Sequence, residues 1–150
     1  MIIIILAAGK GNRLKKTLPK SFPYKTKSLI PIKNEPAIKR LVNQFLEIKK
    51  NDILLVLGHK YSSVLNVFKH KKQFFVLNKN YERDANLRSV FLGFEKIITE
   101  KIFNINEGVL VIEADSFFDS KILENFLKHV NNLNTSKEII NKICWTTKGN

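Results

Sequence analysis

The chain has 150 residues and a formal net charge of +13, from 26 Lys and Arg against 13 Asp and Glu. Hydrophobic residues make up 44% and charged residues 26%, a composition that indicates a folded domain and excludes a disordered chain. The apolar N-terminal stretch is too short for a membrane span and lacks the features of a signal peptide, and the lone Cys144 excludes an internal disulfide. We therefore expect one cytoplasmic domain over residues 1–150.

The positive charge has two interpretations, because a basic chain can bind nucleic acid or a small anionic substrate. The lysines are scattered along the chain and are not interleaved with aromatic residues as a base-stacking surface requires. The chain is also rich in Asn and Ile, whose codons are AT-rich like those of Lys, so base composition accounts for part of the charge. These patterns favour a small anionic substrate over nucleic acid.

The first expected element is a strand over Ile2–Leu6, which is apolar on both faces like a central strand of a parallel sheet. The next segment, Ala7–Glu35, is basic and contains proline, and we expect a long functional loop there. Pro36 suits the first turn of a helix, and apolar residues at helical spacing follow it. The chain therefore begins as a strand, a functional loop and a helix.

Strands and helices alternate over the rest of the chain. In order, we expect a strand over Ile53–Leu57, a helix capped by Ser62 or Ser63, a strand over Phe74–Leu77, a helix over residues 87–98, a strand over Val109–Ile112, a helix capped by Ser120 and a strand over Ile139–Thr146. This alternation predicts a Rossmann-like, three-layer αβα fold with a mostly parallel sheet. Gly9, Gly58, Asn78 and Asp115 each follow a strand, where such sheets bind ligands.

The turn after the first strand, Leu6–Leu14, is small, Gly-rich and basic, which is typical of phosphate-binding turns. It differs from a dinucleotide-binding fingerprint, because Leu14 stands where the third glycine is needed. It also differs from a P-loop, because no Gly-Lys-Ser/Thr sequence ends it.

The turn instead matches the nucleotidyltransferase signature Leu-Ala-Ala-Gly-x-Gly-x-Arg-Leu at Leu6–Leu14, and the downstream Lys-x-Leu-x-Pro element is present at Lys27–Pro31. Over nearly its whole length the chain resembles the nucleoside-triphosphate (NTP) transferase family with a GT-A-like fold. It is most similar to the branch that contains CTP:phosphocholine cytidylyltransferases, on the basis of Asn78, residues 81–89 and the strand end Ile112–Asp115.

The resemblance implies that the turn wraps the nucleotide phosphates and that Arg13 and Lys27 are catalytic, neutralising phosphate charge. The expected nucleotide-binding residues are Leu6, Ala7, Ala8, Gly9, Gly11, Asn12, Arg13, Asn78, Asn86 and Ser89. Simpler roles stay open, since Arg13 and Lys27 can be surface charges and Asn86 a helix cap. Lys20 is the rival of Lys27, and Ala85 replaces a second Asn that the family often has.

Asp115 is the expected Mg²⁺ ligand, because it ends a hydrophobic strand and Mg²⁺ takes one or two carboxylates with phosphates and waters. The alternative is that Asp115 only stabilises a turn. Glu113 and Asp119 are the other candidates for the metal.

The reaction implied by the resemblance is nucleotidyl transfer, in which a phosphate or phosphonate oxygen of a small acceptor such as phosphocholine attacks the α-phosphorus of an NTP, with CTP expected, and pyrophosphate leaves. The alternatives are a sugar-1-phosphate nucleotidyltransferase and a catalytically incomplete nucleotide-binding remnant. Family members continue beyond the last strand of this chain, so we expect the C-terminal part of the acceptor-binding region and a second metal-binding aspartate to be lacking. An open sheet edge would also favour a homodimer.

Overall fold

The computed structural model describes residues 1–17, 26–48, 52–68, 74–83, 86–104, 106 and 108–135, without the side chains of Lys15 and residues 131–135. The chain divides into two compact units, Met1–Phe117 and Phe118–Asn150. The expected strand over Ile139–Thr146, together with Cys144, Lys20 and Ala85, lies outside the described residues.

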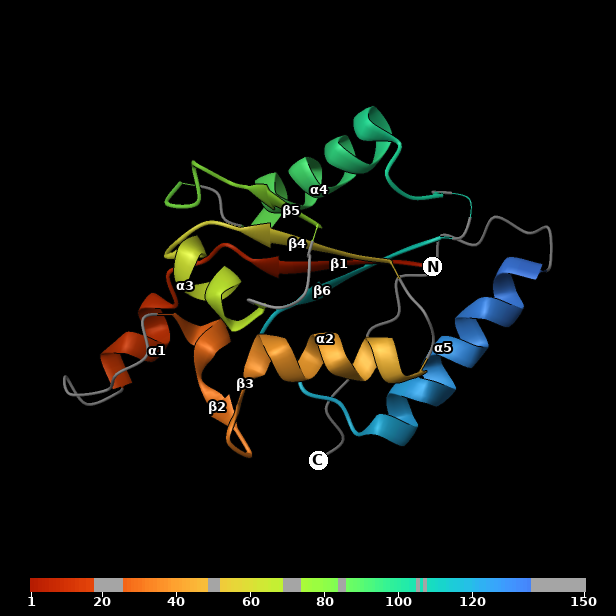
Figure 1. Ribbon diagram of the computed structural model, residues 1–150, viewed down its shortest axis with the longest axis horizontal. Helices are drawn as coiled ribbons and strands as arrows, with labels where there is room; N and C mark the ends of the chain where they lie inside the picture. Colours follow the sequence, from red (N-terminus) through yellow and green to blue (C-terminus); the bar gives the residue numbers. More distant parts are fainter. Residues whose placement is uncertain are drawn as a thin grey trace. The chain divides into compact units, whose positions relative to one another are not determined.

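The first unit is built on a four-stranded sheet (Figure 1). Its strands are β1 (Ile2–Ala7), β4 (Asp52–Leu57), β5 (Phe74–Leu77) and β6 (Val109–Glu113). They lie in the order β5-β4-β1-β6, and all neighbouring pairs are parallel. The expected α/β fold with a parallel sheet is therefore confirmed.

Strand β1 is apolar throughout because it has a strand on each side and side chains packed on both faces. All six of its residues are buried. Ile2, Ile4 and Leu6 belong to the core on the face covered by α4 (Asn86–Glu100). Figure 1 shows α4 on one face of the sheet and α2 (Ala37–Ile48) on the other.

A glycine lets α4 approach the sheet closely. A Cβ atom placed on Gly93 would lie 3.0 Å from the Ile4 Cγ2 atom and 3.4 Å from the Val56 Cγ2 atom. Interiors are packed to crystal-like density, so even a methyl group at this point would have to displace a neighbour. Gly93 therefore sets the distance between α4 and the two central strands.

The loop expected over Ala7–Glu35 contains more structure than the sequence suggested. It includes α1 (Asn12–Thr17), η1 (Lys27–Leu29), and β2 (Pro31–Ile32) paired antiparallel with β3 (Glu35–Pro36). The expectation of a continuous loop was wrong for these short elements. Each has two to six residues, too few to show a helical or strand period in the sequence.

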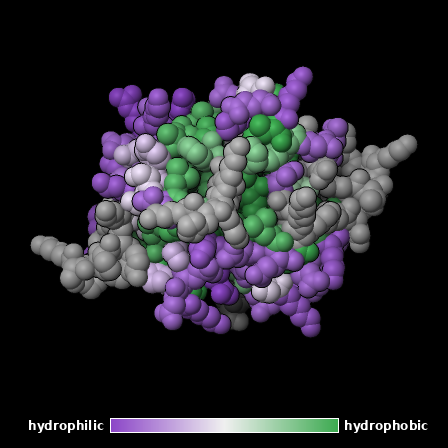
Figure 2. Space-filling view, in the orientation of Figure 1, coloured by the Kyte–Doolittle hydropathy of each residue, from purple (hydrophilic) through white to green (hydrophobic). Residues whose placement is uncertain are grey.

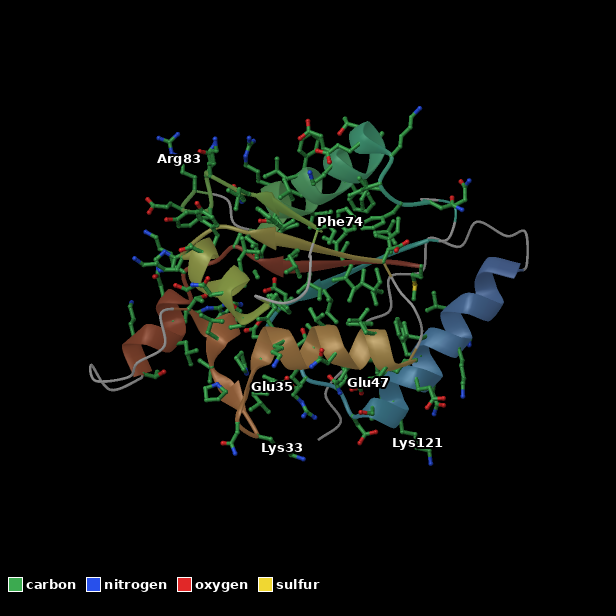
Figure 3. The ribbon with its side chains drawn as sticks, viewed as in Figure 1. Lys33, Glu35, Glu47, Phe74, Arg83 and Lys121 are labelled. Carbon is green, nitrogen blue, oxygen red and sulfur yellow. The ribbon has the colours of Figure 1, made fainter. Side chains whose placement is uncertain are left out.

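The β2–β3 hairpin turns at Lys33 and Asn34, whose φ angles are 47° and 67°. Two consecutive positive φ angles match the twist of a tight antiparallel hairpin. The Glu35 carboxylate then accepts a hydrogen bond from Asn43 Nδ2 at 3.1 Å, beside α2 (Figure 3). Pro36 ends β3, and α2 begins directly after it, at Ala37.

Two helix starts differ from the expected caps. Ser62 and Ser63 lie inside α3 (Tyr61–Leu65), which is followed by η2 (Asn66–Phe68), and the left-handed Lys60 precedes α3. In the second unit, α5 (Ser120–Thr135) is capped by Asp119, whose Oδ1 atom accepts hydrogen bonds from the backbone N–H groups of Lys121 and Ile122 at 2.9 and 3.3 Å. A carboxylate is as good an N-cap as a serine hydroxyl, so the sequence alone did not separate the two neighbours.

Hydrophobic residues gather over the middle of the face shown in Figure 2, with hydrophilic residues around them. A separate question is whether any helix could cross a membrane. Among the residues that the structure describes, no helix is both long enough and apolar enough to span a bilayer.

The strand order defines where a ligand is expected. The chain passes from β1 to β4 and β5 on one side, and then returns to the other side of β1 as β6. The order therefore reverses between β1 and β6. In open α/β sheets the binding crevice lies at this reversal, beyond the carboxyl ends of the strands.

Candidate functional site

The end of β1 is held on both sides by backbone hydrogen bonds. The Ala114 N–H donates to the Leu6 carbonyl at 3.0 Å, and the His59 N–H donates to the Ala8 carbonyl at 2.9 Å. The Gly-rich turn therefore starts from a rigid point. Its first three expected nucleotide-binding residues, Leu6–Ala8, are buried in the sheet end.

Gly11 lets Lys27 lie against the turn. Its φ angle is +67°, which side chains rarely tolerate, and a Cβ atom there would lie 3.3 Å from the Lys27 Cβ atom. Lys27 belongs to η1, whose backbone is anchored by the buried side chains of Thr26 and Ser28. The glycine and the buried neighbours together position the base of the Lys27 side chain.

The Lys27 ammonium group lies between two carboxylates at the end of β6. Its Nζ atom is 3.2 Å from Glu113 Oε2 and 3.0 Å from Asp115 Oδ1. The two expected residues Lys27 and Asp115 are therefore in direct contact, although they are 88 positions apart in the chain. Glu113, the alternative metal ligand, joins them.

The environment of Lys27 keeps it charged. Partial burial would lower the pKa of the Lys27 ammonium group, but the hydrogen bonds and negative charges of Asp115 and Glu113 outweigh this and raise the pKa above its ordinary value. A raised pKa in the folded state stabilises the fold at neutral pH, and this contribution is lost only as the pH rises above 10.5 through the folded value.

A pocket of about 660 Å³ opens beside this cluster, within the size range of small-ligand sites. The turn, α1, the loop after β5 and the end of β6 line it. Its lining residues are Gly9, Lys10, Gly11, Asn12, Arg13, Leu14, Thr17, Lys27, Tyr81, Glu82 and Asp115. Six of them, Gly9, Gly11, Asn12, Arg13, Lys27 and Asp115, are candidates named from the sequence.

One contact across the pocket was not predicted from the sequence. Lys10 forms an ion pair with Glu82, and its ammonium group lies 5.8 Å from the centre of the Tyr81 ring. The Tyr81 ring also contacts His59, with 5.7 Å between the ring centres. The sequence feature that could have identified these residues is their position. Lys10, His59 and Tyr81 all follow strand ends.

Three further candidates lie away from this pocket. Asn78 and Ser89 are buried, and the Asn78 Nδ2 atom donates to the Ser89 hydroxyl oxygen at 3.0 Å. The Asn78 Oδ1 atom also accepts from the Asn80 N–H at 3.0 Å. Asn86 is the exposed first residue of α4. The hydrogen bond between Asn78 and Ser89 joins the end of β5 to α4. A nucleotide-binding role for Asn78, Ser89 and Asn86 stays a prediction.

Asn78 does line a second hollow of about 580 Å³ between the ends of β4 and β5. Its other lining residues include His59, Lys60, Tyr61 and Lys79. Tyr81 lines both hollows and therefore stands where they meet.

The donor set fits a magnesium ion. Two carboxylates, Glu113 and Asp115, approach one point, which lies beside a pocket with space for phosphates and waters, the ligands that Mg²⁺ usually adds to one or two carboxylates. Across the described part of the chain, no group of three or more His, Cys, Asp or Glu residues could hold a metal alone. Asp119, the third candidate, caps α5 instead.

Solved structures share this fold. A nucleotidyl transferase from Methanothermobacter has a TM-score of 0.62 at 18% identity, over 85% of this chain and 56% of that one. A manganese complex of Rv0371C from Mycobacterium tuberculosis has a TM-score of 0.58 at 12% identity, over 87% and 59%. A CTP:phosphocholine cytidylyltransferase from Streptococcus pneumoniae has a TM-score of 0.57 at 24% identity, over 80% and 50%.

Sequence comparison agrees with the fold. The chain is 26% identical over 142 residues to the bifunctional protein GlmU of Pseudoalteromonas atlantica, covering 93% of this chain and 28% of that protein. The chain therefore spans about half the length of the solved structures and about a quarter of GlmU. The family model described as the MobA-like NTP transferase domain matches residues 3–141. The chain belongs to the MobA-like NTP transferase domain family.

Proposed function

We propose that this chain acts as a Mg²⁺-dependent nucleotidyltransferase that binds its NTP in the pocket beside the Gly-rich turn. In this proposal a nucleoside monophosphate, CMP from CTP, is transferred to a small phosphorylated acceptor such as phosphocholine, and pyrophosphate is released. The main support is the meeting of the Gly-rich turn, Lys27 and Asp115 on one pocket at the point where the strand order reverses.

The residues of the pocket suit charge neutralisation. The small residues of the turn leave backbone N–H groups accessible to phosphate oxygens, and Arg13 offers a planar fork of donors for the same oxygens. Lys27 supplies a compact positive charge for the phosphoryl group that is transferred. A phosphate dianion is already a nucleophile, so the proposal needs no general base and relies on positioning and electrostatic stabilisation.

Asp115, with Glu113 beside it, would hold the metal ion. A bound Mg²⁺ would neutralise phosphate charge and help to orient the triphosphate. The manganese complex of a protein with the same fold supports a divalent metal ion.

The choice of CTP and phosphocholine rests on a structural neighbour and on two places in the sequence. A protein with this fold is a CTP:phosphocholine cytidylyltransferase by name, and the sequence features at Asn78 and Ile112–Asp115 favour the same branch. The alternative is a sugar-1-phosphate nucleotidyltransferase, which a preference for a sugar 1-phosphate as the acceptor would identify.

Calorimetric titration of the intact chain with each of the four NTPs and Mg²⁺ tests the proposal. We expect selective binding of CTP, which Asp115→Asn weakens. Asp52→Asn is the matched control, because Asp52 is an exposed carboxylate at the start of β4, at the opposite ends of the strands. Binding of another NTP would overturn the choice of donor, and absence of binding to all four would overturn the nucleotide-binding role.

Turnover is a separate measurement. Pyrophosphate release from the bound NTP is followed with phosphocholine, aminoethylphosphonate or a sugar 1-phosphate as the acceptor. Release with phosphocholine supports the proposal. Release only with a sugar phosphate supports the alternative, and binding without release supports the nucleotide-binding remnant.

A further inference from the structure

We propose that Lys27 acts as a built-in counter-cation, which occupies the Glu113–Asp115 carboxylate pair until a divalent metal ion displaces it. In this inference the lysine and the metal ion exclude each other, and Lys27 moves to the nucleotide phosphates when the metal binds. The inference deepens the proposed function and rests on it for the identity of the site.

The Lys27 ammonium group and a metal ion compete for the same space. The Lys27 Nζ atom is within hydrogen-bond distance of one oxygen from each carboxylate, at 3.2 and 3.0 Å. A Mg²⁺ ion binds oxygen at about 2.0–2.1 Å, so an ion on the same Asp115 oxygen would stand where the ammonium group now lies. The two cations cannot share this position.

The charges of the Lys27 ammonium group and a metal ion also oppose binding of both at once. A divalent ion bound to either oxygen of Asp115 would stand a few ångströms from the ammonium group, and the repulsion between them is substantial because Lys27 is only 23% exposed. Two carboxylates balance the charge of one divalent ion, but they do not balance that ion and an ammonium group together. Retaining Lys27 therefore weakens metal binding.

Lys27 has other possible partners within reach of its side chain. Its Cβ atom lies beside Gly11, on the wall of the pocket that the turn also lines. A flexible lysine stem that starts from this point can reach a phosphate bound by the turn while the backbone of η1 stays in place. Lys27 thus exchanges two carboxylates for phosphate oxygens.

The consequence is coupling between the two ligands. A nucleotide that attracts Lys27 frees the carboxylates for the metal ion, and a metal ion that takes the carboxylates frees Lys27 for the nucleotide. Each ligand must then raise the affinity for the other by the same factor, as linkage requires.

The test measures Mn²⁺ binding without nucleotide, by electron paramagnetic resonance of the free ion. We expect Lys27→Met to bind Mn²⁺ roughly 10- to 100-fold more tightly than the unsubstituted chain, because the ion no longer has to replace a charge-assisted hydrogen bond to the carboxylates. Lys10→Met is the matched control, because Lys10 lines the same pocket but pairs with Glu82. We expect less than about a threefold change there, as for a screened charge farther away.

Two further variants test whether the change in Mn²⁺ affinity depends on the positive charge at position 27 and on Asp115. Lys27→Arg keeps the positive charge and is expected to keep the weak Mn²⁺ affinity. Adding Asp115→Asn to Lys27→Met is expected to remove the gain in affinity. Unchanged or weaker Mn²⁺ binding by Lys27→Met would overturn the inference, and so would a gain that survives Asp115→Asn.

A measurement on the unsubstituted chain applies even if Lys27→Met does not fold. Titration with Mg²⁺, observed through the lysine side-chain NMR signals, is expected to shift the Lys27 signal and leave that of Lys10 in place. An unmoved Lys27 signal at saturating Mg²⁺ would contradict the inference.

The outcomes separate this inference from the proposed function. The metal experiments use no nucleotide, so tighter Mn²⁺ binding by Lys27→Met supports the counter-cation role even if no NTP binds. NTP binding together with unchanged Mn²⁺ affinity would instead leave the proposed function standing and remove this inference.

Discussion

Gly58 lies so close to Ala8 that a Cβ atom placed on Gly58 would come within 2.7 Å of the Ala8 carbonyl oxygen. The same oxygen accepts the hydrogen bond from the His59 N–H at 2.9 Å. The Tyr81 Cβ atom would also lie 3.0 Å from that Cβ atom. The ends of β1 and β4 and the loop after β5 therefore pack closely around Gly58. Only a hydrogen atom fits at its side-chain position.

We predict that Gly58→Ala destabilises the protein by about 1–3 kcal/mol, the usual cost of overpacking a close contact. The obstacle is backbone and Cβ atoms, which cannot rotate away as the end of a long side chain can. Urea unfolding measures the change as a lower midpoint at constant slope.

Gly9→Ala is the control for this prediction. In the described part of the chain, a Cβ atom at Gly9 has no neighbour within 4 Å, and the residue lacks a positive φ angle. We expect the free energy of unfolding to stay within about 0.5 kcal/mol, as at most unobstructed surface positions. Equal destabilisation by both substitutions would show that the contact with Ala8 is not the cause.

We predict that Ser89→Ala lowers the free energy of unfolding by about 1–3 kcal/mol, because it removes the acceptor of a hydrogen bond from the fully buried Asn78 Nδ2. If Ser89 only joins α4 to the end of β5, NTP affinity stays unchanged at a temperature where the variant is folded. A loss of affinity without a loss of stability would support the nucleotide contact that the family resemblance implies. Urea unfolding and calorimetric NTP titration of the same sample distinguish a purely structural role of Ser89 from a contact with the nucleotide.

We predict that Arg13→Ala weakens NTP binding roughly 10- to 100-fold, the equivalent of one or two charge-assisted hydrogen bonds. Arg13→Lys should restore only part of the affinity, since an ammonium group lacks the planar fork. Lys16→Met is the control, because Lys16 is an exposed cation of the same helix that is not part of the pocket lining. A similar loss in Lys16→Met would mean that the net charge of α1 matters and that Arg13 has no specific contact.

The ion pair across the pocket predicts a pH dependence. The hydrogen bond from Lys10, and its charge, lower the pKa of the Glu82 carboxyl group below 4.5. A lowered pKa in the folded state stabilises the fold at neutral pH, and this contribution is lost as the pH falls from 4.5 through the folded value.

NMR titration of the Glu82 carboxyl carbon measures this pKa directly. We expect Lys10→Met to move the midpoint upward, towards the ordinary value. Lys96→Met, which removes a lysine that pairs with Glu100, should leave the Glu82 midpoint in place. An unshifted Glu82 midpoint in Lys10→Met would show that the pair does not persist in solution.

The sheet was predictable because its strands have strong local patterns. Five consecutive apolar residues before a Gly-rich turn identify β1 as a strand that is buried on both faces. Val109–Ile112 before Asp115 identifies a second apolar strand, which is half-buried in the structure. The general rule for alternating strands and helices predicts that the turn and Asp115 lie at the same edge of the sheet, at carboxyl ends of parallel strands. That β6 lies directly beside β1 was not predicted and comes from the structure.

The short elements and the contacts across the pocket were not predictable in the same way. The β2–β3 hairpin depends on positive φ angles at Lys33 and Asn34, and lysine is not a residue that signals such a turn. The Lys10–Glu82 pair depends on how two loops face each other, which no periodicity records. Burial of Asn78 against Ser89 is a property of the folded chain, since the sequence alone does not tell a buried amide from one that faces a ligand.

The position of β6 beside β1 has a consequence for synthesis on the ribosome. Lys27 emerges early, but its carboxylate partners follow 86 and 88 positions later. Most of the first unit must therefore be translated before Glu113 and Asp115 can pack beside Lys27 and the Gly-rich turn. Closing so long a segment is slow compared with forming local helices, so the pocket is expected to be among the last parts of the unit to mature during folding.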